Sequence, residues 1–451
     1  MFKNVKSVYL IGVGGISMSA IALLLKHKGL NVFGSDSQLS SITDNLIAQG
    51  IFVVRGESPE FVNACDLCIV SSAISENNSD VVLLKSLNKT IISRAQALSE
   101  IIADKKCISI AGTHGKTSTT GMLASVMLQA GLDPTVHIGG ILNQINSNLH
   151  IGQGEYFLTE ACEYKDSFLL LKSDISVVLN VESDHMDYFK NMNNLVKSFK
   201  KFAKNTKKYG FCILNRKNVD IVDGLDLSVV TFGNGGFVDA RDCKEYMPGR
   251  YSYDLYIDNQ FVDEIKLSAF GLHNVENSLA VVVVSLLLDI DLKDIKGGLL
   301  NYAGVQRRME LISNYPFVIH DYAHHPTEIQ NTLAVCKKIN KNIIAIFQPH
   351  LFSRTKDFYH EFLECFFDAK EVWLLPIYPA REKEIEGINS RQLSLDLSKR
   401  GVKSMFFDSF EACEKEIRAS SENYLFVILG AGDIHELAMS LKNIEKTIWH
   451  S

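Results

Sequence analysis

The sequence predicts an α/β protein, with mostly parallel β-sheets and helices on their faces. Short apolar segments alternate with segments of helical periodicity along most of the chain. Twice, at residues 8–25 and 107–128, an apolar segment leads into a glycine-rich turn and then into an apolar helix. The length of 451 residues exceeds what a single hydrophobic core normally organises, so we expect about three domains.

The composition is that of an ordinary soluble protein. The 46 basic and 52 acidic side chains give a net charge of −6, which argues against a nucleic-acid partner bound by bulk electrostatics. Nine scattered cysteines suit a reducing compartment, and Cys65 and Cys68 lie in an apolar segment that favours packing over metal binding. We find no signal peptide, and the longest apolar run, residues 279–288, is about half the ~20 residues that cross a bilayer. We therefore expect a cytoplasmic protein.

The first strand, residues 8–11, runs into the turn Gly12-Val13-Gly14-Gly15-Ile16-Ser17 and then into a helix. This is a Rossmann-like opening, in which glycines and a helix N-terminus can hold a diphosphate. Ser17 stands where the strict dinucleotide pattern has its third glycine, so a plain tight turn and a dinucleotide site remain alternatives. Asp36, after the next strand-like segment, is placed to meet a ribose or a base.

Further strands are predicted at residues 52–54, 67–70 and 90–92, with helical spacing between them. Strands that alternate with helices imply a mostly parallel sheet. Ser71 follows one of these strands, at the carboxyl end where open α/β sheets bind ligands. The first domain is expected to close near residue 100.

The second glycine turn, Gly112-Thr113-His114-Gly115-Lys116-Thr117, predicts a phosphate-binding loop. Backbone N–H groups and the helix N-terminus would surround phosphate oxygens, Lys116 would reach the β- and γ-phosphates, and the Thr117 hydroxyl would bind Mg²⁺. Ile110 stands where the longer P-loop pattern has its first glycine, so the loop is a shortened form. ATP is the expected ligand, and a glycine turn with an exposed lysine is the alternative.

An acidic residue ends one later strand-like segment, residues 157–160, and acidic residues follow another, residues 175–180. Hard cations take oxygen ligands, and the carboxyl ends of parallel strands converge on the loop. Glu160 and His185 are therefore candidate Mg²⁺ ligands. A solvated acidic turn around His185 is the alternative.

Residues 251–257 and 261–267 alternate like the strands of a β-hairpin. The helical segment that follows begins with Asn274 and Asn277 on one face, where they could read the edge of a base. Helix capping by Asn274 is the alternative. Arg307 and Arg308 supply fixed positive charge for phosphate, or else form a solvated basic pair.

A third region starts near residue 311. Each of its four predicted apolar strands is followed directly by a polar segment, which is typical of an open α/β sheet. The strands are residues 317–319, 343–347, 372–375 and 426–429. The predicted domains are residues 1–100, 101–310 and 311–451.

These motifs together resemble the Mur ligase family over almost the whole chain. Three motifs are shared across the family: residues 112–117, 180–185 and 273–277. Five others are typical of the members that add L-alanine: residues 12–18, 34–36, 321–328, 378–382 and 430–434.

The resemblance implies three domains: a Rossmann-like one for a UDP-sugar, a central P-loop ATPase-type one, and a Rossmann-like C-terminal one. It implies ATP- and Mg²⁺-dependent attachment of L-alanine to the lactyl carboxylate of UDP-N-acetylmuramate through an acyl phosphate. It also implies no nucleic-acid or membrane partner, and a monomer or weak homodimer.

The resemblance also implies roles for individual residues. The catalytic residues would be Lys116, His185 and Glu160, and the metal ligands Thr117, Glu160 and His185. ATP would meet Gly112, Thr113, His114, Gly115, Lys116, Thr117, Ser118, Asn274, Asn277, Arg308 and Asp321. The other substrates would meet Gly14, Gly15, Ser17, Ser35, Asp36, Ser71, His324, His350 and Arg354.

The chain departs from the family pattern in places. Cys162 stands where many members have aspartate, Leu351 where many have a basic residue, and no lysine matches the carbamylated one of several sister ligases. A ligase that attaches a recycled murein tripeptide to the same UDP-sugar is the close alternative. A regulatory ATPase is another, and an NAD-linked oxidoreductase would rest on the Gly12 turn alone.

Overall fold

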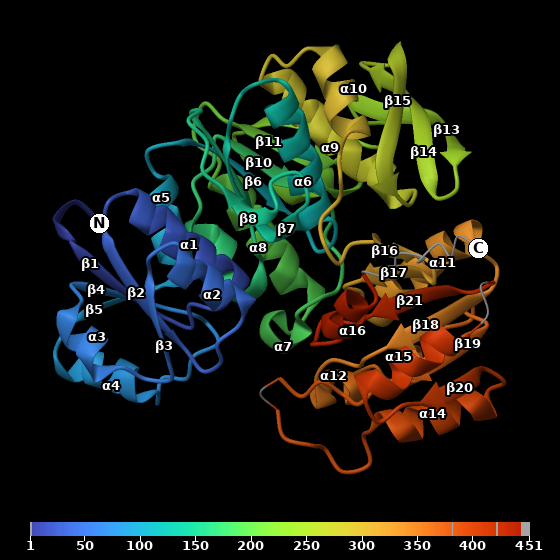
Figure 1. The fold of residues 1–451 in the computed structure, drawn as a ribbon. Coiled ribbons are helices and arrows are strands. Elements are labelled where there is room, and N and C mark those ends of the chain that lie inside the picture. Colours follow the sequence, from blue (N-terminus) through green and yellow to red (C-terminus); the bar gives the residue numbers. More distant parts are fainter. Residues whose placement is uncertain (1, 381, 421–422, 443–451) are drawn as a thin grey trace, which may run out of the picture. The chain divides into compact units, whose positions relative to one another are not determined.

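The computed structural model describes residues 2–380, 382–420 and 423–442 (Figure 1). The chain divides into two compact units. The first comprises the residues up to Cys243 together with Tyr253–Lys266 and His273–Ala303. The second comprises Lys244–Ser252, Leu267–Leu272 and the chain from Gly304 on.

The first sheet is five-stranded and parallel, in the order β3-β2-β1-β4-β5. Its strands are β1 (Ser7–Ile11), β2 (Asn31–Asp36), β3 (Phe52–Arg55), β4 (Leu67–Val70) and β5 (Thr90–Ser93). One hydrophobic cluster joins it to α1 (Ile16–His27), α2 (Ser41–Ala48) and α5 (Arg94–Ile102), and another to α3 (Pro59–Ala64) and α4 (Ser79–Ser86). Because β1 pairs with both β2 and β4, the Gly12 turn lies at the switch point of the sheet.

The second sheet has the order β15-β14-β13-β12-β11-β10-β6-β9-β7-β8. Its strands are β6 (Lys106–Ala111), β7 (Thr135–Leu142), β8 (Ser147–His150), β9 (Tyr156–Glu160), β10 (Ile175–Val178), β11 (Phe211–Asn215), β12 (Ser228–Phe232), β13 (Val238–Met247), β14 (Arg250–Ile257) and β15 (Gln260–Phe270). The pairs from β12 to β7 are parallel, and β8 is antiparallel to β7. Since β6 pairs with β10 and β9, the phosphate loop also follows a switch point.

Helices cover the central strands (Figure 1). The group α6 (Lys116–Gln129), α9 (His273–Leu287) and α10 (Leu292–Leu300) packs so closely that a Cβ on Gly298 would lie 2.4 Å from Val126 Cα. The helix α8 (Met192–Lys204) packs with the 3₁₀ segment η2 (Tyr164–Leu170), where the Phe168 and Phe202 rings stack at 4.8 Å. The same hydrophobic cluster contains α1, α5, η2 and α8 residues, so the two sheets share one core.

The second unit holds a six-stranded sheet, in the order β16-β17-β21-β18-β19-β20. Its strands are β16 (Glu310–Asn314), β17 (Phe317–Asp321), β18 (Ile343–Phe347), β19 (Glu371–Leu374), β20 (Lys403–Phe406) and β21 (Leu425–Leu429). One hydrophobic cluster includes α11 (Pro326–Ile339), α13 (Tyr359–Phe362) and α14 (Ser390–Lys399), and another includes α15 (Phe410–Ala419) and α16 (His435–Ser440). All pairs are parallel except β16 with β17, which confirms the predicted open sheet.

The three sheets span residues 7–93, 106–270 and 310–429. The predicted domain limits at 100/101 and 310/311 remain predictions, since the first two sheets lie in one compact unit. Cys65 and Cys68 are buried and unpaired with each other, which confirms their predicted packing role. Within the described ranges, no helix is long and apolar enough to span a bilayer.

Candidate active site

The phosphate loop connects β6 to α6 through two glycines that no other residue could replace without strain. Gly112 has φ 144° and Gly115 has φ 84°, both in the region that favours glycine. A Cβ on Gly112 would also lie 2.9 Å from the Cβ of Leu179. The local sequence therefore selects this loop shape.

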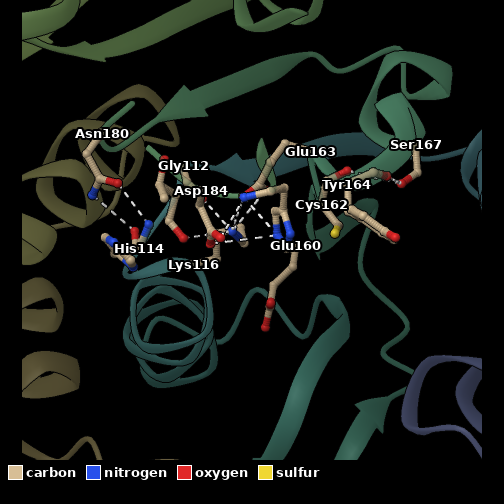
Figure 2. Close-up of polar contacts among 12 residues, drawn as sticks. Gly112, His114, Lys116, Glu160, Cys162, Glu163, Tyr164, Ser167, Asn180 and Asp184 are labelled. Carbon is tan, nitrogen blue, oxygen red and sulfur yellow. Dashed lines mark hydrogen bonds and ion pairs between the residues drawn. The ribbon is translucent and has the colours of Figure 1, made fainter. Parts of the chain in front are cut away.

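The loop is fastened to the segment after β10 (Figure 2). The amide N–H of Thr113 donates to the Asn180 carbonyl at 3.1 Å, and that of His114 donates to Asn180 Oδ1 at 2.8 Å. In return, Asn180 Nδ2 donates to the His114 carbonyl at 3.1 Å, and Glu182 N donates to Thr113 Oγ1 at 2.9 Å. Asn180 thus holds the loop, a role that sequence reasoning did not assign to it.

Lys116 points back over the loop. Its Nζ donates to the carbonyls of Gly112 at 2.5 Å and Thr113 at 3.1 Å, and pairs with Glu163 at 3.0 Å (Figure 2). The Glu163 side chain is 1% exposed, so this is a buried ion pair. Glu163 was missed from the sequence, where a glutamate three residues beyond a strand end gives no distinguishing signal.

Thr117 and Glu160, both predicted metal ligands, lie together. Thr117 Oγ1 donates to Glu160 Oε2 at 3.1 Å, and Glu160 Oε1 accepts from Gly139 N at 2.6 Å. Ser118 follows in the first turn of α6, half-buried. A hydroxyl and a carboxylate are oxygen donors that fit a hard cation such as Mg²⁺.

His185 belongs to a second group of donors. Among the described residues, Glu163, Asp184 and His185 form the one cluster whose potential ligand atoms all lie within 4.8 Å of one another. His185 has φ 53°, and its ring lies 4.9 Å from the Tyr164 ring. Because Glu163 also pairs with Lys116, the loop lysine and this cluster form one polar site.

Asn274 and Asn277 are both buried in α9, and Asn277 Nδ2 donates to Asn274 Oδ1 at 3.0 Å. The helix begins at His273, so Asn274 lies inside it and the capping alternative is wrong. A Cβ on Gly115 would lie 2.6 Å from Asn277 Oδ1. The asparagine pair therefore lies directly against the phosphate loop.

The Gly12 turn is held by the end of β2. Asp36 Oδ2 accepts from Gly14 N at 2.8 Å, and the Ser35 carbonyl accepts from Gly12 N at 2.8 Å. The Ser35 side chain is 2% exposed and lies 2.6 Å from the Tyr9 hydroxyl. The Ser35 side chain is therefore buried against Tyr9, and its contact with substrate stays a prediction.

Two more predicted residues border this turn. Ser71 follows β4, and a Cβ on Gly12 would lie 3.0 Å from Ser71 Cβ. Ser17, in the first turn of α1, accepts a hydrogen bond from Arg94 at 3.0 Å. Gly15 is the N-cap of the same helix. Four predicted residues, Gly14, Gly15, Ser17 and Ser71, thus lie around one loop, and their contact with substrate stays a prediction.

In the second unit, Asp321 is the last residue of β17, and its side chain binds backbone amides before β16 and after β17. It accepts from the amides of Met309 at 2.7 Å and Ala323 at 2.8 Å, and burial raises its pKa above the ordinary value. The Arg308 guanidinium lies 5.1 Å from the Tyr322 ring centre. Arg308 and Asp321, predicted as a pair, are therefore close to each other.

His324, His350 and Arg354 also gather in this unit. The two imidazole rings lie 6.0 Å apart, and burial lowers the pKa of each histidine to about 4, with Arg354 lowering it further. Both rings are therefore neutral at pH 7. The helix α12 (Phe352–Asp357) that carries Arg354 follows Leu351, whose φ is 70°.

Models of three successive Mur ligase segments match the chain. The Mur ligase family catalytic domain matches residues 7–106, the Mur ligase middle domain residues 110–285, and the Mur ligase glutamate ligase domain residues 307–432.

Similar proteins include the UDP-N-acetylmuramate–L-alanine ligase of Clostridium tetani, 39% identical over 443 residues, or 96% of this chain and 97% of that protein. The ligase of the same name from Lachnospira eligens is 38% identical over 453 residues, 98% of each chain. The crystal structure of the UDP-N-acetylmuramate–alanine ligase from Thermotoga maritima is 28% identical, with a TM-score of 0.84 over 97% of this chain and 98% of that one.

A murein peptide ligase from Psychrobacter arcticus, 22% identical, shares the fold with a TM-score of 0.72 over 98% of this chain and 99% of that one. Since sequence relatives above 30% identity align over almost the entire chain, and three successive family segments match it in order, the chain belongs to the Mur ligase family.

Proposed function

We propose that this chain joins L-alanine to the lactyl carboxylate of UDP-N-acetylmuramate, with ATP as the co-substrate. The observation that carries the proposal is the name shared by relatives that are 37–39% identical over almost its full length. The murein tripeptide ligase is the second candidate, and the structure from Psychrobacter arcticus supports it through fold alone, at 22% identity. The first reaction step forms an acyl phosphate and ADP, and the second forms the amide and releases phosphate.

The phosphate loop and Lys116 bind the triphosphate in this proposal. Free backbone donors at the start of α6 and its helix dipole favour anionic oxygens. Lys116 reaches them from its position over Gly112 and Thr113. When the carboxylate of the sugar approaches the γ-phosphorus, the ammonium group opposes the repulsion between the two anions.

Mg²⁺ supplies further charge neutralisation when bound. Thr117 and Glu160 would hold one ion, because their oxygens already converge. His185 would hold a second ion, with Glu163 and Asp184 as additional donors in the same cluster. Four of these side chains, Thr117, Glu160, Glu163 and Asp184, offer the oxygen donors that this hard cation prefers.

The Gly12 turn and α1 bind the UDP-sugar diphosphate in this proposal, with Gly15, Ser17 and Ser71 nearest to it and Asp36 holding the turn. Asn274 and Asn277 would meet adenine, and Arg308 and Asp321 the nucleotide. His324, His350 and Arg354 would receive L-alanine, where the guanidinium suits its carboxylate and the two imidazole rings carry no positive charge that would repel its amine.

We also propose that the enzyme is cytoplasmic, that it is a monomer or a weak dimer, and that it has no nucleic-acid or membrane partner.

The proposed reaction is tested by measuring phosphate release from ATP with UDP-N-acetylmuramate, in the presence and absence of L-alanine. We expect release that requires both, and a product heavier by one alanyl residue. Release that needs L-alanyl-γ-D-glutamyl-diaminopimelate instead would establish the tripeptide ligase, and release indifferent to the sugar would rule out both.

A further inference from the structure

A chain of hydrogen bonds crosses from the first sheet to the second within the first unit. Arg94 donates to Ser17 Oγ at 3.0 Å, and Ser17 Oγ lies 2.9 Å from Nε2 of His137 on β7. His137 Nδ1 lies 2.9 Å from Thr159 Oγ1 on β9, which donates to the Glu160 carbonyl at 3.1 Å. The chain therefore runs from the UDP-sugar turn to the metal-site strand.

The carbonyl end of this chain fixes its direction. The Thr159 hydroxyl gives its single proton to the Glu160 carbonyl, so it must accept from His137 Nδ1–H, and the neutral ring is then left with an acceptor at Nε2. Ser17 donates to Nε2 of His137, and the Nδ1–H of His137 donates to Thr159. The tautomer of His137 is thus determined by its partners, and burial, with the side chain 4% exposed, keeps the ring neutral by lowering its pKa to about 3.

Besides this chain, the β7–β8 pair makes one further hydrogen bond to the proposed metal site and one to the proposed sugar-nucleotide site. Gly139, two residues after His137 on β7, donates its amide to the Glu160 carboxylate at 2.6 Å. Asn148 on β8 donates to the Ile16 carbonyl at 2.5 Å, at the start of α1. A displacement of β7 would therefore move the Glu160 carboxylate, and a displacement of the Ser17 turn would pull on β7.

We propose that His137 is a positioning residue that couples the sugar-nucleotide turn to the Glu160 carboxylate. The inference rests on the proposed function. Occupancy of the turn by UDP-N-acetylmuramate sets Ser17, and His137 transmits that position to the strand that carries Glu160. By linkage, binding of the sugar and binding of the Mg²⁺-nucleotide then strengthen each other by the same factor.

The test is calorimetric titration of UDP-N-acetylmuramate into the whole protein, with and without saturating Mg²⁺ and a non-hydrolysable ATP analogue. The ratio of the two dissociation constants is the coupling factor. We expect about fivefold or more for the unaltered chain and a factor near one for His137→Asn, which keeps a donor for Thr159 but cannot reach Ser17. His137→Gln, long enough to accept from Ser17, should recover part of the coupling.

His150→Asn is the matched control, since His150 lies on β8 and bonds to Asp133 at 2.7 Å, outside the chain. It should leave the factor unchanged. Ser17→Ala should abolish coupling, and Ser17→Ala with His137→Asn should lose nothing further. A folded His137→Asn variant that retains the full factor overturns the inference, as does an unaltered chain that binds the sugar without coupling. An unaltered chain that binds no sugar overturns the proposed function instead.

Discussion

Lys116 holds together the loop and the buried Glu163. In Lys116→Ala, no donor replaces the ammonium near the phosphates, so we expect kcat for phosphate release to fall about 100-fold or more. The same change leaves the Glu163 carboxylate buried at 1% exposure without its cation, which should also lower the free energy of unfolding by about 3 kcal/mol.

The double variant Lys116→Ala, Glu163→Gln separates these two effects. Neutralising the glutamate removes the unpaired charge, so thermal unfolding should return towards that of the original chain while kcat stays low. If activity returned together with stability, Lys116 would have no role beyond structure.

Residue spacing predicted Lys116, Thr117 and Glu160 correctly as neighbours, because a loop and an adjacent parallel strand end at the same sheet edge. It did not predict that the Ser35 side chain faces the Tyr9 hydroxyl, since a serine in a strand gives the same pattern whether its side chain faces solvent or the interior. Glu163 was missed because its ion-pair partner, Lys116, is distant in sequence.

At the scale of elements, η2 carries backbone strain beside the site. Lys165 and Asp166 have φ values of 51° and 56°, which cost non-glycine residues about 1 kcal/mol or more each. Asp166 accepts hydrogen bonds from Tyr188 at 2.8 Å and from Ser198, so α7 (Met186–Phe189) and α8 hold the strained turn. The segment η2 also carries Tyr164, whose ring lies against the ring of His185.

Asp166→Ala and Asp166→Gly lose the same hydrogen bonds but differ in strain. Alanine keeps the left-handed cost and glycine removes it, so the melting temperature should fall from the original chain to Asp166→Gly and further to Asp166→Ala. Calorimetric melting of the three proteins checks this order. Equal melting temperatures for the two variants would show that backbone strain at residue 166 does not lower the stability of the protein.

Some elements with a clear pattern were predicted, whereas others, such as the apolar strand β11, were not. The β14–β15 hairpin was recognised, and Asp258 and Asn259 join it with φ 49° and 61°, as tight hairpin turns require. The strand β7 was missed because Gly139 and Gly140 interrupt its β-branched pattern. Strand β20 was missed because it has only four residues and each of its faces carries one polar and one apolar side chain, so its sequence shows no clear alternation.

At the scale of the molecule, the sequence predicted three α/β regions but not that two share a core. Periodicity shows which face of an element is apolar, and it carries no information about which sheet that face meets. Leu98 on α5, which follows the first sheet, and Phe168 on η2, which follows a strand of the second sheet, join one hydrophobic cluster. That shared core is what allows Ser17 and His137 to meet.

The buried histidines predict how the whole molecule responds to acid. Burial lowers the pKa of His137 and His320 to about 3 and of His324 and His350 to about 4, against about 6.5 in an unfolded chain. Between these values the unfolded chain binds more protons, so stability is complete above pH 6.5 and falls as the pH drops towards 4. Each histidine contributes a slope of up to about 1.4 kcal/mol per pH unit.

The two units should not respond equally, because one of these histidines lies in the first unit and three lie in the second. Asp321, whose pKa burial raises, opposes the trend in the second unit and offsets part of it. We therefore expect the second unit to unfold first as the pH falls from 6.5 to 4.5. Hydrogen exchange, measured separately for segments along the chain, checks this order.

His320→Leu isolates one of these contributions. Among the described residues neither ring nitrogen of His320 has a hydrogen-bond partner, so leucine removes a desolvated group without breaking a bond. Urea unfolding of the second unit should then show a slope against pH smaller by up to about 1.4 kcal/mol per unit between pH 6 and 4.5. An unchanged slope would mean that His320 binds no extra proton on unfolding, and that carboxylates alone set the acid response.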